Sequence, residues 1–419
     1  MESVIPRTLK RFESYQTQLY KNHILNRLQK MTRGQLRLEI EGDSHRYSFG
    51  LGNRVKAHLR IKNERFFSRF VQDGELGFGE SYVDGDWDSE DLIALMTWFM
   101  INIKEDHTFE FSNESTLVQI LASLYKLQSY LVTSDRYSAF DQNISYRYDL
   151  DRRFFASFLD ESLTYSAGLF HQTDNLEQAQ LNKNRRIGQQ LRIKPEHHIL
   201  EIGCGWGSLA FYLALTYSCK VTAVTVSEEQ FYYVRARIKE LNLQDRIYPK
   251  LMDFRDVKGT YDRIVSIELI DSLVAQDLPS FFQCCRSLLK SQGLMLHQVL
   301  LKPESSSIHQ QGDWVEKYIT PGSLTPTLSE ILRAANHYAD FNIMELQDMG
   351  PDYANTLQHW FARFQSNRLS IRRLGYDEAF IRTWEYYLAY VHAAFNLGIL
   401  TCAQVTMTRP GTVVPSILS

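Results

Sequence analysis

Residues 199–210 read Ile-Leu-Glu-Ile-Gly-Cys-Gly-Trp-Gly-Ser-Leu-Ala, and this stretch decides the fold. The run up to Ile202 is short, apolar and branched, which is typical of a buried parallel strand. Glycines stand at 203, 205 and 207, and an apolar helix-like segment follows over 209–215. A strand, a glycine turn and a helix in this order let the backbone approach a ligand closely and point a helix N-terminus at it. We therefore predict a ligand-binding turn at the end of this strand.

The glycine spacing narrows the class of ligand. The pattern is E-x-G-x-G-x-G, which differs from the G-x-G-x-x-G of dinucleotide-binding proteins. Glu201 would repel a pyrophosphate, whereas it suits a ligand that carries a cation and hydroxyl groups. S-adenosylmethionine has this chemistry in its amino group, its sulfonium and its ribose. Because three glycines also fit an ordinary strand-to-helix turn, the rest of the chain has to decide.

Short apolar runs alternate with helical segments around the glycine turn, which predicts a doubly wound, Rossmann-like α/β sheet of parallel strands. After residue 302 the chain is expected to be mostly helical to 395 and to cover the site, and 404–409 alternates like a closing strand. The expected strands are 199–202, 221–226, 247–251, 263–267 and 294–299, with helices at 228–241 and 275–290.

The first part of the chain predicts a smaller α+β domain. Residues 8–31 have the spacing of an amphipathic helix, and the alternation between 36 and 61 predicts two or three antiparallel strands. The glycine- and acid-rich stretch 73–88 lacks the spacing of an EF-hand, so turns and helix caps are expected there. The predicted division is an N-terminal domain at 1–132 that ends in helices at 92–103 and 117–132, a linker at 133–145, and a second domain at 146–410 whose segment 302–395 is the helical cover.

Composition excludes some classes of function. The 419 residues carry a formal net charge of −3, which gives no argument for nucleic-acid binding. The five cysteines contain no C-x-x-C pair, so no zinc site, other metal site or disulfide framework is expected. The longest apolar run, 92–103, is shorter than the roughly 20 residues that span a bilayer, and the N-terminus lacks the pattern of a signal peptide. We therefore predict a cytoplasmic protein whose membrane contact, if any, is peripheral.

Many separated blocks accompany the glycine turn. They read GESYVDGDWD at 79–88, YS at 165–166, NLEQAQ at 175–180, LEIGCGWG at 200–207, TVSEEQ at 225–230, YDRIVSI at 261–267, DW at 313–314, KYI at 317–319, PG at 321–322, PDY at 351–353 and WEYY at 384–387. In these blocks the chain resembles the cyclopropane-fatty-acyl-phospholipid synthase family of S-adenosylmethionine-dependent methyltransferases. The resemblance extends over residues 70–410 and is far more specific than the glycine turn alone.

The resemblance implies a set of residues that bind S-adenosylmethionine. Tyr165 and Ser166 match the pair that closes over the methionine end of the cofactor. The strand ending at Thr225 lacks the acid that commonly holds the ribose, and the family uses Thr, Ser and Gln side chains there. The implied set is Tyr165, Ser166, Gly203, Gly205, Thr225, Ser227, Gln230, Asp253, Phe254, Arg255 and Ile267.

The family's reaction also needs a base. An isolated double bond attacks the sulfonium methyl group and becomes a carbocation, and a base then removes a methyl proton to close the cyclopropane ring. The family holds a bicarbonate ion as that base with a cysteine, a glutamate, a histidine and a tyrosine. These positions match Ala167, Asp271, Gln298 and Tyr353, so only the tyrosine is kept, and the implied catalytic residues are Asp271, Gln298 and Tyr353. His297 precedes Gln298, but successive side chains of a strand face opposite ways, so it cannot substitute.

The resemblance therefore implies an intact cofactor half and an altered base half. The implied activity is methyl transfer to the double bond of unsaturated phospholipid acyl chains, at the inner face of a membrane and by a homodimer. The changes leave open whether bicarbonate binds and whether a ring closes, since the cation could lose another proton and give a methyl- or methylene-branched chain. Relatives carry Gly or Glu at the position of Glu268, and the sequence leaves open whether this residue acts in the site or only ends a strand.

Two further hypotheses belong to other classes. A plant-type amine N-methyltransferase branch would need a Glu-x-x-x-His pattern, whereas this chain has Asp271 and Ala275. A catalytically inactive protein that only binds lipid or cofactor would explain the altered base site, but it would not need the retained cofactor residues.

Overall fold

The computed structural model describes residues 7–103, 150–273, 277–304, 314–320 and 325–412. The chain forms two compact units. One unit consists of residues 1–145, 313–318 and 375–397, and the other of residues 146–312, 319–374 and 398–419.

Within the described residues, the second unit is built on a seven-stranded sheet in the order β10-β11-β9-β8-β5-β6-β7. Strands β5 to β9 are parallel to their neighbours within this group, and β11 is antiparallel to both β9 and β10. This arrangement confirms the predicted Rossmann-like α/β fold. The strands are β5 His198–Ile202, β6 Lys220–Thr225, β7 Ile247–Leu251, β8 Tyr261–Ile267, β9 Leu289–Leu301, β10 Asn342–Asp348 and β11 Thr401–Thr408.

Strand β10 is a correction, because it lies in the region that was expected to be helical. Its seven residues are mostly exposed or half-buried, so they lack the apolar alternation that marks a strand in the sequence. Pairing along the length of β11, from Asn342 with Thr408 to Asp348 with Ala403, supplies the hydrogen bonds that hold it. The tertiary partner, and not the local sequence, determines this strand.

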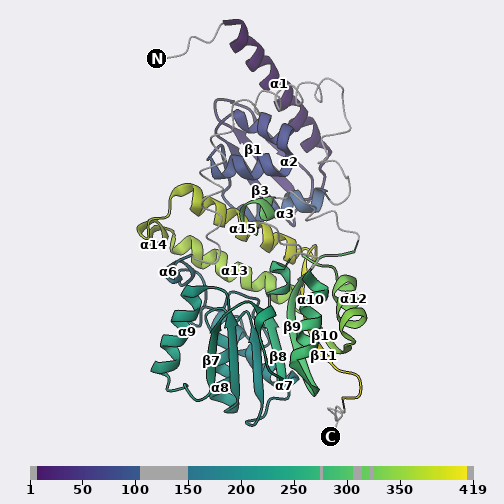
Figure 1. Ribbon diagram of the computed structural model, residues 1–419. Helices are drawn as coiled ribbons and strands as arrows, with labels where there is room; N and C mark the ends of the chain where they lie inside the picture. The colour runs from purple at the N-terminus through teal and green to yellow at the C-terminus, as the bar shows by residue number, and fades with distance from the viewer. Residues whose placement is uncertain (1–6, 104–149, 274–276, 305–313, 321–324, 413–419) are drawn as a thin grey trace. The chain divides into compact units, whose positions relative to one another are not determined.

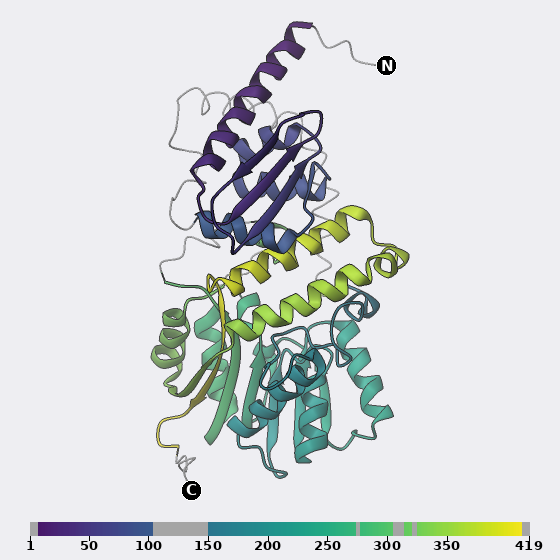
Figure 2. The same ribbon diagram turned by 180° about the vertical axis from the view of Figure 1, so that it is seen from behind.

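Helices cover both faces of this sheet (Figures 1 and 2). Apolar residues of α7, α8 and α9 form one core cluster with β5, β6 and β8, and those of α10 and α12 form a second cluster on the other face. Cover on both faces explains why the central strands are apolar throughout. The helices are α7 Leu176–Gln190, α8 Ser208–Tyr217, α9 Glu228–Glu240, α10 Leu278–Leu288 and α12 Leu328–Ala339, with 3-10 helices η3 Phe254–Asp256 and η4 Ile270–Ser272.

Three further helices of this unit are α6 Arg152–Phe155, α13 Gly350–Ser366 and α14 Arg368–Arg373. Helix α13 crosses one end of the sheet in both views (Figures 1 and 2). Its Thr356 accepts a hydrogen bond from the Gly168 N–H at 3.0 Å, so the helix is tied to the segment that follows Tyr165.

The first unit contains a four-stranded sheet in the order β2-β1-β3-β4. Strands β1 and β2 are antiparallel as predicted, but β1 and β3 are parallel, so the prediction is wrong for that pair. Residues 73–83, expected to form turns, continue helix α2 beyond a kink at Gly74, because Phe78 and Tyr82 are buried along this helix. The elements are α1 Arg7–Lys30, β1 Gln35–Ile40, β2 Arg46–Phe49, β3 Lys56–Ile61, α2 Arg65–Val83, β4 Trp87–Asp88, α3 Leu92–Ile103, α11 Trp314–Tyr318 and α15 Glu378–Asn396. The predicted helix at 117–132 and linker at 133–145 lie outside the described residues.

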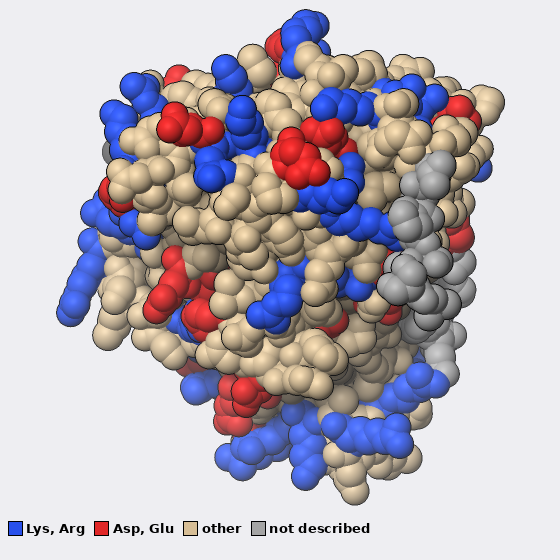
Figure 3. Space-filling view, turned by 90° about the horizontal axis from the view of Figure 1, so that it is seen from below, with Lys and Arg blue, Asp and Glu red and all other residues tan. Residues whose placement is uncertain are grey.

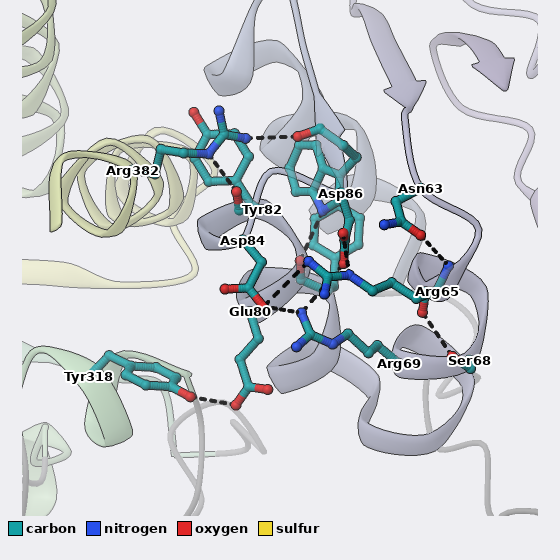
Figure 4. A network of polar contacts seen from close by, with 12 residues as sticks. Asn63, Arg65, Ser68, Arg69, Glu80, Tyr82, Asp84, Asp86, Tyr318 and Arg382 are labelled. Atoms are coloured by element: carbon teal, nitrogen blue, oxygen red, sulfur yellow. Dashed lines mark hydrogen bonds and ion pairs between the residues drawn. The ribbon is translucent and has the colours of Figure 1, made fainter. Parts of the chain in front are cut away.

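Two segments that are distant in sequence belong to this first unit, namely α11 and α15. Figure 4 shows how polar groups tie them to α2. Arg382 of α15 donates to the Tyr82 carbonyl at 2.5 Å, and its guanidinium lies 3.9 Å from the centre of the Tyr82 ring. Lys317 of α11 donates to Glu80 at 2.9 Å, and Tyr318 donates to the same carboxylate. The predicted division had assigned both segments to the helical cover of the second domain, so the structure differs there.

The face drawn in Figure 3 carries Lys and Arg interspersed with Asp and Glu over a largely uncharged surface, so this face has no single-sign field. Among the described helices, none combines the length and the apolar character that crossing a bilayer requires.

Candidate active site

The glycine turn has the backbone that its sequence predicts. Gly203, Gly205 and Gly207 have φ values of 79°, 52° and 84°, all in the left-handed region. The N–H groups of Gly203 and Cys204 both donate to the Val224 carbonyl at 2.9 Å, which ties the turn to the end of β6. A Cβ at Gly207 would lie 2.9 Å from the Phe211 ring, so close packing also requires glycine there. Helix α8 begins at the next residue, and its first N–H groups face the turn.

The predicted ribose residues lie together where β6 meets α9. Thr225 donates from Oγ1 to Gln230 Oε1 at 2.7 Å and accepts from the Ser227 N–H at 3.1 Å. Ser227 in turn caps α9 by accepting from the Gln230 N–H. The three side chains therefore form one hydrogen-bonded group beside the glycine turn, since β5 and β6 are neighbours in the sheet.

The remaining predicted cofactor residues follow the next strand ends. Asp253 caps η3 and its carboxylate holds the Arg255 guanidinium at 2.8 Å. The Phe254 ring is buried against Phe281, with ring centres 5.3 Å apart. Ile267 is the last residue of β8. The structure thus places these residues at the carboxyl ends of the parallel strands, where ligands of such sheets bind.

A buried carboxylate supports the fit of S-adenosylmethionine to this edge. Glu201, at the end of β5, is 3% exposed, and burial raises its pKa to about 8. Its Oε2 atom has no hydrogen-bond partner among the described residues. An acceptor of this kind next to three left-handed glycines and two buried hydroxyls suits a ligand that offers hydroxyl and amine donors.

A segment held by α7 carries Tyr165 and Ser166. The Ser166 carbonyl accepts from Gln180 Nε2 at 2.8 Å, and its Oγ accepts from Lys183 Nζ at 2.7 Å. Lys183 is fully buried, which lowers its pKa to about 8. The sequence reasoning missed Lys183, because a single lysine in a polar helix has no local mark of burial.

A carboxylate cluster lies at the end of β8, and its centre is Glu268. The Oε1 atom accepts from the Ala167 N–H at 2.9 Å and from Gln298 Nε2 at 2.7 Å, and Oε2 accepts from the Tyr353 hydroxyl at 3.0 Å. The Cys402 Sγ lies 3.8 Å from Oε1. We refer to Glu268, Ala167, Gln298, Tyr353 and Cys402 as the carboxylate cluster.

The environment of Glu268 shifts its proton affinity. The residue keeps some accessible surface, yet the protein around its carboxylate raises the pKa above the usual value of a glutamate. The hydrogen bonds from Ala167, Gln298 and Tyr353 and the charge of Lys183 act in the opposite direction. A carboxylate that is desolvated but held by donors is suited to accept a proton.

Gln298 is oriented by a further amide. Gln404 of β11, directly opposite in the antiparallel register, donates from Nε2 to Gln298 Oε1 at 3.0 Å. Since that oxygen is occupied, the Gln298 amide nitrogen points at Glu268. Arg186 of α7 donates to Gln404 Oε1 at 3.1 Å and fixes this second amide. Gln404 and Arg186 also escaped sequence reasoning, because only the pairing of β9 with β11 brings them to the site.

The predicted catalytic residues are therefore partly brought together. Gln298 and Tyr353 meet at the carboxylate of Glu268. Asp271 lies in η4, where its charge raises the pKa of Cys402 after the larger effects of burial and of Glu268, and its catalytic role stays a prediction. His297 lies on the opposite face of β9 between Phe281 and Phe282, and burial lowers its pKa to about 3. The prediction that His297 cannot replace Gln298 is confirmed.

An aromatic cluster adjoins the carboxylate cluster. Tyr353 packs edge-on against Trp360, with ring centres 6.1 Å apart, and Trp360 stacks on Tyr165 at 5.1 Å. Phe158 packs against both Trp360 and Tyr165. One polar centre in an aromatic wall is the composition expected of a site for a largely apolar substrate.

The fold and the glycine turn define a Rossmann-like S-adenosylmethionine-dependent methyltransferase. Comparisons narrow the class. The family model described as mycolic acid cyclopropane synthetase matches residues 136–405. The chain therefore belongs to the mycolic acid cyclopropane synthetase family.

Individual relatives agree with this assignment. The chain is 32% identical to the tuberculostearic acid methyltransferase UfaA1 of Mycobacterium tuberculosis, over 93% of this chain and 91% of that protein. It is 31% identical to the cyclopropane-fatty-acyl-phospholipid synthase of Escherichia coli, over 87% of this chain and 91% of that protein. Among solved structures, the mycolic acid cyclopropane synthase CmaA1 complexed with SAH and CTAB aligns with a TM-score of 0.60 and 26% identity, over 64% of this chain and 98% of that one.

Proposed function

We propose that this protein transfers a methyl group from S-adenosylmethionine to a double-bond carbon in the unsaturated acyl chains of phospholipids. The observation that carries the proposal is the double role of Tyr353. Its hydroxyl binds the Glu268 carboxylate while its ring packs in the aromatic cluster. The residues thus combine an apolar wall for an acyl chain with one polar centre for proton transfer.

The residues divide the work between two sides of the site. S-adenosylmethionine supplies an electrophilic methyl group when it is bound. The glycine turn, Thr225, Ser227 and Gln230 would hold it, with Tyr165 and Ser166 closing over its methionine end. The aromatic cluster keeps water from the reacting carbons, and the faces of Tyr165 and Trp360 favour positive charge that develops on the chain.

The fate of the proton decides the product. Loss of a proton from the transferred methyl group closes a cyclopropane ring, whereas loss of a chain proton leaves a methyl- or methylene-branched chain. The relative from Escherichia coli is named for the first product, and the mycobacterial relative is named as a methyltransferase. Cyclopropanation is the main proposal, and branching without ring closure is the second candidate.

A phospholipid substrate requires access to a membrane surface. Helix α14 offers one contact, because Leu369 is 70% exposed on a helix that also carries Arg368, Arg372 and Arg373. An exposed apolar side chain among arginines fits an anionic lipid surface. Peripheral binding at the inner membrane face and a homodimer remain part of the proposal. Co-sedimentation with anionic vesicles should fall for Leu369→Asp, and light scattering measures the oligomeric state.

The proposed reaction is tested with purified full-length protein, vesicles of unsaturated phospholipid and S-adenosylmethionine that carries a trideuterated methyl group. We expect acyl chains that gain a labelled carbon, with saturated phospholipid as the matched control. A product that keeps two deuterium atoms and resists hydrogenation contains a ring, whereas one that takes up hydrogen is unsaturated and branched. If unsaturated lipid gains no label under conditions where the protein binds the cofactor, the proposed function is wrong.

A further inference from the structure

The donors of the carboxylate cluster are all directed at one side chain. An external anion such as bicarbonate would need hydrogen-bond donors from the positions of Ala167, Gln298 and Tyr353. In this chain the Ala167 N–H, the Gln298 amide and the Tyr353 hydroxyl donate to Glu268, at 2.7 to 3.0 Å. A second anion would have to share these donors and lie beside a carboxylate of the same charge. The residues present therefore do not fit bicarbonate.

The backbone of Glu268 shows that this placement is built in. Its φ is 50°, in the left-handed region that costs a non-glycine residue on the order of 1–3 kcal/mol. The conformation is fixed because the Glu268 N–H donates to the Gln298 carbonyl at 2.7 Å. A strained backbone held in place at a site is a signal of function. Here it turns the carboxylate back toward β9 and α13.

We infer that Glu268 is the proton acceptor of the reaction and takes the place that bicarbonate has in related enzymes. This inference rests on the proposed function for its reaction. Methyl transfer forms a C–C bond from the π electrons of the alkene and breaks the C–S bond, whose electrons stay on sulfur. The Glu268 carboxylate then accepts a proton from a carbon next to the cation. The electron pair of that C–H bond forms the third ring bond or a new double bond.

The surrounding residues support this role. Gln404 and Arg186 hold the Gln298 amide in the orientation that binds the carboxylate. The positive charge of Lys183 lies behind Ser166, the residue before Ala167, and favours the ionised form of Glu268. The chain thus carries its own base, and turnover should not depend on dissolved carbon dioxide.

Two substitutions test the inference. Glu268→Gln removes the acceptor and keeps the size of the side chain, so we expect turnover to fall by about 10²- to 10⁴-fold, as for loss of a general base. Glu268→Gly removes the side chain at a φ that glycine adopts freely, and it leaves the three donors without the carboxylate. We expect this variant to be inactive in carbon dioxide-free buffer and to regain part of its turnover with bicarbonate or formate. Glu240→Gln, on the exposed end of α9, is the matched control for the loss of one carboxylate.

A binding measurement separates this inference from the proposed function. Titration of ¹³C-bicarbonate, followed by NMR, should show no binding at this site in the natural protein and binding in Glu268→Gly. Cofactor calorimetry on each variant shows that the fold is retained. If the natural protein binds bicarbonate as tightly as Glu268→Gly does, or if its turnover falls when carbon dioxide is removed, Glu268 is not the resident base. Failure to methylate any lipid would overturn the proposed function alone, because the NMR comparison still decides the role of the Glu268 position.

Discussion

The cofactor edge and the carboxylate cluster lie at the same ends of the same sheet, yet they are built differently. At the cofactor edge, each contact joins residues close in sequence or in neighbouring strands, such as Thr225 with Gln230. In the carboxylate cluster, Glu268 receives its three hydrogen bonds from residues that are 101, 30 and 85 positions away in the chain. A local arrangement keeps its geometry when distant residues change, whereas the cluster depends on every segment at once. The following predictions test this contrast.

The largest effect is expected for Gln298→Leu. This change removes a hydrogen bond to a charged group and leaves the carboxylate with fewer donors, which costs roughly 1.5–3 kcal/mol. Turnover should therefore fall by about 10- to 100-fold, while cofactor affinity, measured by calorimetry, should stay within about twofold of the natural protein. Gln404→Leu, one step further from Glu268, should give a smaller loss, since it only frees the Gln298 amide. Equal losses of cofactor affinity and turnover would show that the two regions are not separate.

The second prediction concerns the cofactor edge. Gly203→Ala places a Cβ 3.2 Å from the Leu269 side chain at a φ of 79°, so the turn must shift. We expect cofactor affinity to fall by about 10-fold, in line with strain of 1–3 kcal/mol. Gly85→Ala is the matched control, because Gly85 has a φ of 80° in the first unit and a Cβ there would meet open space. A similar loss of affinity in the control would refute a local cause.

The third prediction is a pH dependence of stability. Burial raises the pKa of Glu201 to about 8, against an ordinary value near 4.5, so the folded protein binds one more proton than the unfolded chain between these values. The stability that Glu201 contributes is fully present below this window and is lost as the pH rises through about 8. The melting temperature of the natural protein should therefore fall from about pH 5 to about pH 8. Glu201→Gln should show a flatter profile over the same range, and parallel profiles would contradict this origin.

The smallest effect is expected at the cap of α9. Ser227→Ala removes the side chain that accepts from the Gln230 N–H, which typically costs about 1 kcal/mol. In a unit of this size the melting temperature should fall by about 2–4 °C. Because Ser227 is also a predicted cofactor residue, cofactor affinity should fall as well, whereas bicarbonate binding to the Glu268→Gly variant should not change. A change in that anion binding would link the two regions.

The sequence by itself determined the cofactor edge and most of the sheet. The order of glycines at 203, 205 and 207, the apolar strands and the hydroxyls at Thr225 and Ser227 are local patterns, and the structure places them together. Such patterns can be read because a turn and a cap form between residues a few positions apart. Strand β10 could not be read in this way, since its half-exposed residues become a strand only through pairing with β11.

Only the tertiary structure decided the base side of the site. Matching positions with the family pointed to Asp271, Gln298 and Tyr353, and it gave Glu268 no clear role. The fold turns the Glu268 carboxylate into the centre of the cluster because its left-handed backbone, the pairing of β9 with β11 and the position of α13 act together. The assignment of α15 to the first unit has the same cause, since its partners Tyr82 and Trp87 lie about 300 residues earlier in the chain. Contacts between distant segments depend on how the elements pack, and no local pattern of residues records that packing.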